Sequence, residues 1–249
     1  MAFQSVARVA GAVVLCAALA GCVTRGDGMI TGSLGERTAM YGARPNERYP
    51  LPATNIAGVP KKYLRQQVHF TGPYEPGTIV VDTNNRFLYL VEPGGRAMRY
   101  GIGVGKAGLA FSGEAVIGRK AEWPSWTPTA DMIAREPERN LPWKNGMPGG
   151  PGNPLGPRAL YLYDNGRDTM FRIHGTTEPL TIGKAVSSGC IRMFNQDVID
   201  LYNRVPVGTR VVVLHNSHPL DQFGDAMAGL ADQVGRGFSN IAAALPSGQ

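Results

Sequence analysis

Short apolar runs separated by turn residues recur along the chain between residues 77 and 214. The segments TIVVDT and RFLYLVE flank Asn84-Asn85, a pair that tolerates the positive φ of a tight turn, and therefore predict a β-hairpin. Further segments of the same character are predicted strands: AMRYGIGVG, EAVIGR, ALYLY, TMFRIHG and TRVVVL. The 33 glycines and 19 prolines also favour many short strands over a helical fold.

One helix is predicted directly after the last of the three cysteines. Asn195 is a suitable N-cap residue, and Pro206 ends the segment. Asp197 and Asp200 suit the positive end of a helix. The apolar residues of this segment fall on one helical face: Val198, Leu201, Tyr202 and Val205.

A long segment without periodicity lies between the predicted strands, from Ala121 to about Gly156, and it holds all the tryptophans: Trp123, Trp126 and Trp143. Loops of this length in a compact domain are usually functional or disordered, and tryptophans argue against disorder. We expect at least one tryptophan to be a core anchor, and flat apolar side chains of this segment can supply the wall of a binding groove. The segment also carries cations that can pair with carboxylates of a ligand: Arg135, Arg139 and Lys144.

The first 24 residues have the pattern of an export signal. Arg8 is the only charged residue among them, and the apolar run that follows it is too short to span a bilayer comfortably. The run ends in LAGC, which resembles the lipobox of bacterial lipoproteins, where the cysteine receives a diacylglyceryl group and becomes the new N-terminus. We therefore expect a signal peptide over residues 1–21 and lipidation at Cys22. An ordinary secretory signal with an incidental cysteine is the alternative.

Lipidation at Cys22 predicts a membrane contact through the N-terminal lipid, which anchors a protein to a membrane surface without spanning it. Because Val23 rather than aspartate follows this cysteine, we expect the outer membrane of a two-membrane organism, with the protein facing the periplasm. Cys16 would leave with the signal peptide. Cys190 would then be the only free thiol of the mature chain, and no intramolecular disulfide is expected.

Charge and motif content narrow the partners. The formal net charge of +6 and the pI of about 9.4 are compatible with nucleic acid, anionic lipid or an anionic cell-wall polymer. However, no Lys/Arg cluster typical of nucleic-acid binding is present in the sequence, and the export signal argues against that partner. His215 and His218 form His-x-x-His without a third ligand nearby, so no metal is expected. The glycines of GIGVG lack the GxGxxG pattern followed by a helix, so they suit a curved strand.

The segment HGTTEPLTIGKAVSSGCIRM places a cysteine sixteen residues after a histidine. A thiol is a good nucleophile only as a thiolate, and its ordinary pKa is about 8.5, so a nearby base has to take its proton. His174 ends a predicted strand and Cys190 precedes a predicted helix, so the chain has room to bring them together. Gly189 allows unusual backbone conformations, and the amides of Gly189 and Cys190 can face a developing oxyanion. Taken alone, such a pair is more often structural than catalytic.

The surrounding residues change that interpretation. The stretch IHGTTEPLTIGKAVSSGCIRM resembles the catalytic segment of the L,D-transpeptidases (the YkuD family), whose pattern is His-Gly, an intervening loop and Ser-x-Gly-Cys-x-Arg/Asn. The resemblance extends from Tyr63 to Leu214 and includes the opening hairpin, the tryptophan segment and the strand VPVGTRVVVL. It implies a mainly β fold, a sandwich or barrel-like catalytic domain with few short helices.

Four parts of the chain are expected on this basis. The signal peptide covers residues 1–21, and residues 22–67 form a lipidated N-terminus with a tether and an extension that lies on the domain. The L,D-transpeptidase catalytic domain covers residues 68–215. The C-terminal tail, residues 216–249, has apolar residues at helical spacing interrupted by four glycines, and we expect an amphipathic helix that packs on the domain or a loosely ordered tail.

The resemblance also implies the chemistry. Cys190 matches the nucleophile, His174 matches the base that activates it, and the carbonyl of Gly175 falls where the family orients that histidine. The substrate would be a peptidoglycan tetrapeptide stem, in which the thiol attacks the amide between diaminopimelate and the terminal D-alanine. D-Alanine leaves, a thioester remains, and an amine resolves it. No metal or organic cofactor is needed.

Three further positions carry expectations. Ser188, Gly189 and Arg192 match positions that line the catalytic loop, and we expect Ser188 and Arg192 to bind substrate. Many family members have a second histidine where this chain has Ser188, so any contribution of that imidazole is absent here.

The acyl acceptor is not fixed by the motif. A diaminopimelate of a second stem gives a cross-link, which we predict. An amine of an envelope protein gives attachment of that protein to peptidoglycan, and water gives a peptidase. A non-catalytic lipoprotein that tethers the outer membrane to the wall through an inactive fold is the alternative from a different class.

Overall fold

The computed structural model describes residues 38–105, 112–187 and 189–214. The predicted signal peptide, Cys22, Ser188 and the C-terminal tail therefore lie outside the described residues. None of the helices within the described ranges is long and apolar enough to cross a membrane.

Short strands are the main regular elements of the described chain. They are β1 (Gln66–His69), β2 (Ile79–Asp82), β3 (Phe87–Glu92), β4 (Arg96–Gly105), β5 (Gly113–Glu122), β6 (Arg158–Asp164), β7 (Arg167–His174), β8 (Ala185–Ser187), β9 (Ile191–Met193) and β10 (Arg210–Val213). The α-helices are α2 (Ala130–Arg135), α3 (Pro137–Asn140) and α4 (Asn195–Arg204), and the 3₁₀ turns are η1 (Lys61–Tyr63), η2 (Leu141–Trp143) and η3 (Pro179–Thr181). The predicted mainly β class is confirmed.

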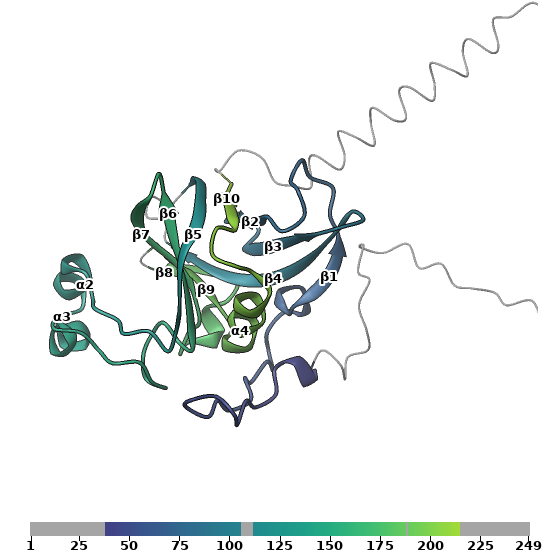
Figure 1. Ribbon diagram of the computed structural model, residues 1–249. Coiled ribbons are helices and arrows are strands. Elements are labelled where there is room, and N and C mark those ends of the chain that lie inside the picture. Colours follow the sequence, from purple (N-terminus) through teal and green to yellow (C-terminus); the bar gives the residue numbers. More distant parts are fainter. Residues whose placement is uncertain (1–37, 106–111, 188, 215–249) are drawn as a thin grey trace, which may run out of the picture.

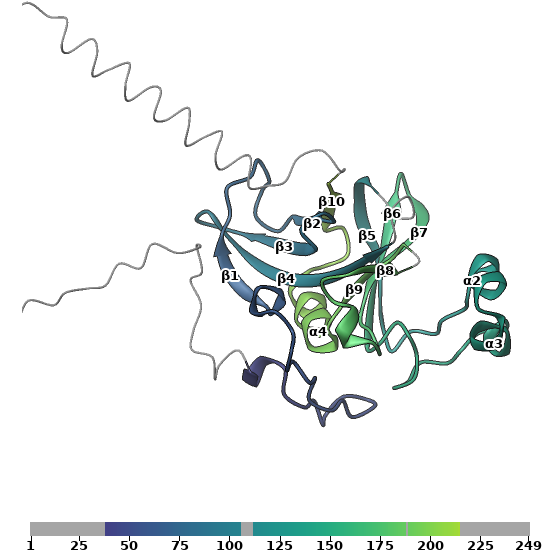
Figure 2. The same ribbon diagram turned by 180° about the vertical axis from the view of Figure 1, so that it is seen from behind.

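The strands close into a barrel. The hydrogen-bonded series β4-β3-β2-β10-β5-β6-β7-β9 returns to its start because β9 pairs with β4 as well as with β7. The length of β4 allows this, since Arg96–Arg99 pair with β1 and the following Ile102 and Gly103 pair with β9. Figures 1 and 2 show β5, β6 and β7 on one side, β2 and β3 on the other, and α4 below β4.

The predicted hairpin is confirmed, but its turn differs from the expectation. Strands β2 and β3 are antiparallel, with Asp82 opposite Phe87, so the loop has four residues. The positive φ falls on Arg86 (61°) and not on the two asparagines. Asn85 instead donates its backbone N–H and its side-chain amide to the Asp82 carboxylate, at 2.9 and 2.8 Å. This side-chain turn moves the left-handed position one residue along the chain.

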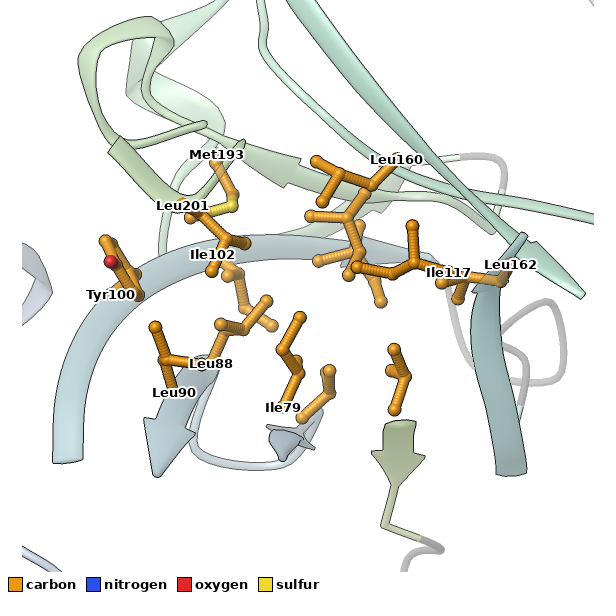
Figure 3. Close-up of a cluster of buried hydrophobic side chains, with 14 of the residues drawn as sticks. Ile79, Leu88, Leu90, Tyr100, Ile102, Ile117, Leu160, Leu162, Met193 and Leu201 are labelled. Atoms are coloured by element: carbon orange, nitrogen blue, oxygen red, sulfur yellow. The ribbon is translucent and has the colours of Figure 1, made fainter. Parts of the chain in front are cut away.

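Successive side chains of β2 and β3 enter two different hydrophobic clusters. Alternate residues of a strand point to opposite faces of a sheet. One set, which includes Ile79, Val81, Leu88 and Leu90, faces the barrel interior, where it meets Ile102, Leu160 and Leu201 (Figure 3). The other set, Val80, Phe87, Tyr89 and Val91, belongs to an outer cluster. Both faces are therefore buried, which explains why these strands are continuously apolar in the sequence.

Residues 38–65 form a segment, here named the N-terminal strap, that packs against the barrel. Tyr41 is 1% exposed and meets the ring of Phe194 edge-on, with centroids 5.4 Å apart. Glu47 accepts two hydrogen bonds of 2.8 Å from the guanidinium of Arg158, at the start of β6. It also accepts one of 3.1 Å from the Trp123 indole. Residues of the N-terminal strap thus contact β6, α4 and their neighbours directly.

Helix α4 occurs as predicted, but its first residue plays a different role. Val198 and Leu201 are fully buried on its inner face. Phe194 is the N-cap residue and makes no side-chain cap, so the prediction of Asn195 as the cap is wrong. Asn195 Oδ1 instead accepts the backbone N–H of Thr176, at 2.9 Å. A tertiary hydrogen bond has displaced the local cap.

The segment from 121 to 156 is more regular than the sequence suggests. It contains α2, α3 and η2, and Thr129 caps α2 by accepting the Met132 N–H at 3.2 Å. Helices α2 and α3 stand out to one side of the barrel, on the side of β6 and β7 (Figure 1). Their six and four residues are too few to produce a visible apolar period. The expectation of an irregular segment is therefore corrected.

Candidate active site

A pocket of about 520 Å³ lies between the α2–α3 segment and the turn that carries the cysteine. Cys190, His174 and Arg192 line one side of it, and Trp126 and Trp143 line the other. The parallel pairing of β7 with β9 brings the two halves of the motif together, because it sets His174 opposite Arg192. The closure of the barrel thus places the predicted histidine and cysteine at one cavity.

His174 is 5% exposed and ends β7. Its Nδ1 lies 2.6 Å from the carbonyl oxygen of Gly175. A carbonyl oxygen only accepts hydrogen bonds, so Nδ1 carries the hydrogen and Nε2 has the lone pair. Burial lowers the pKa of His174 to about 4, the hydrogen bond to Gly175 opposes this, and the nearby Arg192 and Arg172 lower it further. The imidazole is therefore neutral at pH 7 and able to accept a proton.

Cys190 is half-buried in a densely packed turn between β8 and β9. The Ser187 hydroxyl donates to the Cys190 carbonyl oxygen at 2.7 Å and accepts the Gly189 N–H at 3.3 Å. Gly189 has a φ of 129°, a conformation that favours glycine. A Cβ on Gly105 of β4 would lie 2.8 Å from the Gly189 Cα, so this turn sits directly on the strand.

The thiol of Cys190 is not an activated thiolate at rest. Burial raises its pKa above the ordinary value, although the Arg172 backbone and the charges of Arg172 and Arg192 oppose this. With a neutral His174 beside the same pocket, the resting pair is a thiol and an imidazole and not a thiolate and an imidazolium. The proton therefore has to move when the sulfur reacts.

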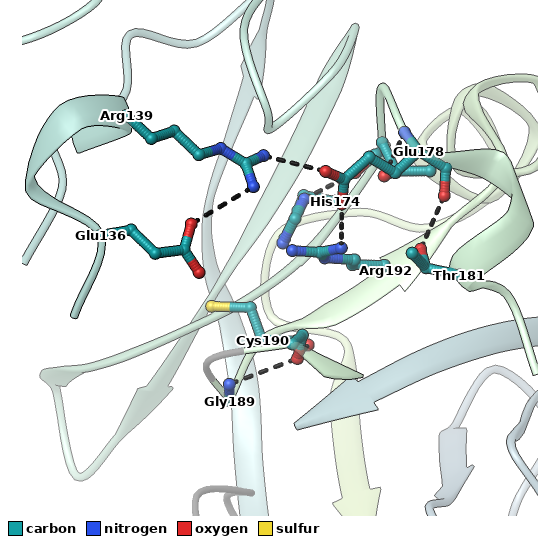
Figure 4. Close-up of polar contacts among 11 residues, drawn as sticks. Glu136, Arg139, His174, Glu178, Thr181, Gly189, Cys190 and Arg192 are labelled. Carbon is teal, nitrogen blue, oxygen red and sulfur yellow. Dashed lines mark hydrogen bonds and ion pairs between the residues drawn. The ribbon is translucent and has the colours of Figure 1, made fainter. Parts of the chain in front are cut away.

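Glu178 is a pocket residue that the sequence analysis missed. Its carboxylate accepts a charged hydrogen bond of 2.7 Å from Arg192 and another of 2.9 Å from Arg139 of α3 (Figure 4). Arg139 also contacts Glu136, at 3.5 Å. Partial burial raises the pKa of Glu178, but both arginines outweigh it and hold that pKa below its ordinary value. A row of alternating charges thus joins α3 to Arg192.

One tryptophan is a core anchor, as expected. Trp123 is 5% exposed and packs with Leu51 and Ile199, so it is the core anchor. Trp126 and Trp143 line the pocket. Among the cations of this segment, Arg135 and Arg139 line the pocket. The described residues contain no group of three or more histidine, cysteine or acidic side chains placed to hold a metal.

Comparison with known proteins identifies the family. A sequence model of the YkuD family, the L,D-transpeptidase catalytic domain, matches residues 76–213. This chain therefore belongs to the L,D-transpeptidase (YkuD) family.

Two curated relatives and one solved structure illustrate the similarity. The probable L,D-transpeptidase YbiS of Escherichia coli is 35% identical over 150 residues, which are 59% of this chain and 47% of that protein. A putative L,D-transpeptidase of Fuscovulum blasticum is 38% identical over 168 residues, 66% of this chain and 82% of that one. A crystal structure from Brucella melitensis, described as a probable carnitine operon oxidoreductase, is 57% identical over 64% of this chain and 99% of its own, with a TM-score of 0.44. The chain spans about half the length of the first of these relatives.

Proposed function

We propose that this protein is an L,D-transpeptidase that acts on peptidoglycan tetrapeptide stems through a thioester at Cys190. The observation that carries the proposal is that His174 and Cys190 line the same pocket, with His174 held in one tautomer. The two residues line one pocket, and the hydrogen bond from Nδ1 to Gly175 leaves Nε2 as the proton acceptor. Membership of the family supports the reaction class.

The proposed first half-reaction moves one proton and exchanges one acyl bond. His174 Nε2 takes the thiol proton while Sγ attacks the carbonyl carbon between diaminopimelate and D-alanine. When the tetrahedral intermediate collapses, the carbon–nitrogen bond breaks and the imidazolium gives its proton to the leaving amine. D-Alanine departs, and the stem stays on Sγ as a thioester.

The second half-reaction returns the enzyme to its starting state. An acceptor amine attacks the thioester carbonyl, and His174 takes a proton from that amine. The carbon–sulfur bond breaks, and the proton passes from His174 to the departing thiolate. Because the resting pair is neutral, each half-reaction begins and ends with the same charge on the two side chains.

We propose the Gly189 amide as a donor to the oxyanion of both intermediates. Its present hydrogen bond to Ser187 is long, at 3.3 Å, and is readily exchanged for a stronger one to an anion. Arg192 is the proposed substrate-binding cation on the cysteine side of the pocket. In the structure its guanidinium forms an ion pair with Glu178. Ser188 keeps its proposed substrate-binding role by position in the motif.

The opposite wall suits the rest of the stem. Trp126, Trp143 and Met147 give the pocket an apolar side. Arg139 reaches the same cavity from α3 and is proposed to pair with stem carboxylates. Flat apolar contacts with a few charged groups are the usual composition of a ligand site.

We propose cross-links between diaminopimelate residues as the product. Attachment of an envelope protein through one of its amines remains the alternative use of the same chemistry. Incubation of the full-length chain in detergent with tetrapeptide muropeptides, followed by mass spectrometry, tests this. A dimer with loss of one D-alanine supports cross-linking, a shortened stem indicates hydrolysis, and no reaction in the wild type, as in Cys190→Ala, contradicts the proposal.

Anchoring through a lipid on Cys22 at the outer membrane, facing the periplasm, is a separate proposal that rests on the LAGC sequence. Cys22→Ala is expected to release or mis-sort the protein, because the lipid would be its main membrane contact. Cell fractionation measures this. Membrane association equal to that of the wild type would contradict lipidation.

A further inference from the structure

The peptide group between Gly175 and Thr176 is held at both of its polar atoms. Its carbonyl oxygen accepts the hydrogen bond from His174 Nδ1, at 2.6 Å. Its N–H donates to Asn195 Oδ1, at 2.9 Å. A peptide group is planar, so the direction of the N–H fixes the direction of the carbonyl on the same bond. Asn195 is therefore linked to His174 through the two hydrogen bonds of this one peptide group.

The surroundings leave this peptide little room to turn. A Cβ on Gly156 would lie 2.5 Å from Asn195 Oδ1 and 3.0 Å from the Gly175 Cα. A Cβ on Gly175 would itself collide with Asn195 Oδ1 and lie 2.9 Å from Pro157 Cδ. A side chain at either Gly156 or Gly175 would collide with the side-chain amide of Asn195. The carbonyl of Gly175 is therefore confined by packing as well as by its hydrogen bond.

Asn195 is in turn fixed by the N-terminal strap. The next residue, Gln196, is 1% exposed and donates to the carbonyl oxygens of Gly42 and Pro52, at 3.2 and 3.1 Å. Thr54 donates its hydroxyl to Gln196 Oε1, at 2.5 Å. The first turn of α4 therefore cannot slide without breaking three part-buried hydrogen bonds.

We propose that Asn195 is a positioning residue for the reaction: it aims the Gly175 carbonyl and thereby holds His174 in the tautomer that presents Nε2 to the thiol. The proposal rests on the proposed function, in which His174 is the base. Without the hydrogen bond from Thr176 to Asn195, the His174 imidazole would be misplaced. Misplacement of a reacting group lowers the rate by roughly 10- to 100-fold. The effect falls on kcat, because Asn195 does not line the pocket.

Imidazole ¹⁵N NMR of the full-length chain in detergent at pH 7 reads the tautomer directly, and steady-state kinetics follow the consequence. The wild type is expected to show His174 with Nδ1 protonated. Asn195→Ala should give a mixture of tautomers and a kcat lower by roughly 10- to 100-fold, with KM little changed. Asn195→Asp keeps the acceptor and should retain the wild-type tautomer. Asn203→Ala, an exposed position of the same helix, is the control.

A single Nδ1-protonated tautomer in Asn195→Ala, with kcat unchanged, would overturn the proposal. If that variant does not fold, Asn195→Ser, whose hydroxyl is too short to reach Thr176, replaces it with the same expected result. The two proposals fail differently. A wild type that does not react with muropeptides but shows the tautomer change in Asn195→Ala refutes the proposed function and keeps the positioning role.

Discussion

The two sides of the pocket are held by different kinds of contact. On the histidine side, His174, Gly175 and Asn195 are linked by hydrogen bonds of 2.6 and 2.9 Å through one peptide, in packing that excludes a Cβ. On the other side, α2 buries no residue, and α3 joins the histidine side through the ion pair of Arg139 with Glu178, whose side chains are 58% and 38% exposed.

This difference has an energetic meaning. A buried polar group that loses its partner costs about 1–3 kcal/mol, whereas an exposed ion pair contributes about 0–1 kcal/mol. The peptide that contacts His174 is therefore held within narrow limits, while α2 and α3 can shift at a smaller cost.

The largest expected effect comes from removing the nucleophile. Cys190→Ala should lower turnover by more than roughly 1,000-fold, because no other group can form the thioester. The domain should stay folded, since the half-buried sulfur lies in a turn outside the main core. Mass spectrometry of muropeptide products and thermal unfolding check both statements. A variant with normal product formation would refute the assignment.

The resting charge state predicts a pH dependence. The pKa of Cys190 is raised, so below that pKa the thiolate fraction grows by about tenfold per pH unit. Alkylation of Cys190 by iodoacetamide should therefore rise by roughly 100-fold between pH 6 and pH 8. N-Acetylcysteine measured in parallel is the control. A rate that is constant over this range would reveal a thiolate–imidazolium pair and contradict the neutral pair.

Two glycines with similar backbone conformations separate strain from close packing. Gly156 has a φ of 65° and lies against Asn195, whereas Gly166 has a φ of 75° and nothing within 4 Å of an added Cβ. Alanine at either position should cost about 1–2 kcal/mol of folding free energy from the positive φ. Only Gly156→Ala should also lower kcat, by roughly tenfold or more, because it displaces the Gly175 peptide. Equal kinetics in the two variants would show that this packing has no role.

The sequence predicted those features whose signals are local. Apolar runs and turn residues were sufficient for the β2–β3 hairpin, and the helical spacing of Val198 and Leu201 was sufficient for α4. That His174 and Cys190 act together was predicted from the family resemblance of the motif and not from local sequence patterns. Nothing in the local pattern indicates that β7 pairs with β9, which is the contact that closes the barrel at the site.

The missed features depend on contacts between distant segments. Asparagine before an apolar helical face is a good N-cap by local chemistry, yet the Thr176 N–H competes for Asn195. Glu178 is one of many charged residues in the sequence, and only the folded chain shows that Arg192 and Arg139 meet on it. The strap is similar, because its polar composition conceals single buried anchors such as Tyr41.

The smallest expected effect lies on the exposed wall. Replacing Arg135 and Arg139 with alanine should raise KM by roughly 2- to 5-fold, with a smaller fall in kcat, because exposed charge pairs contribute little. Lys144→Ala, in the same segment but outside the pocket lining, is the matched control. Steady-state kinetics with tetrapeptide stems measure it. Equal falls in kcat and kcat/KM would place these cations in the chemical step, and no change would leave the segment as scaffold.

The most direct test of the account is the covalent intermediate. The full-length chain is mixed with a tetrapeptide stem whose diaminopimelate side-chain amine is blocked, quenched in acid and measured by intact-protein and peptide mass spectrometry. The account predicts that the acyl part of the stem, without D-alanine, is attached to the peptide that contains Cys190. It also predicts that one equivalent of D-alanine is released and that Cys190→Ala carries no adduct. Release of D-alanine from wild type and variant alike, without an adduct on Cys190, would contradict it.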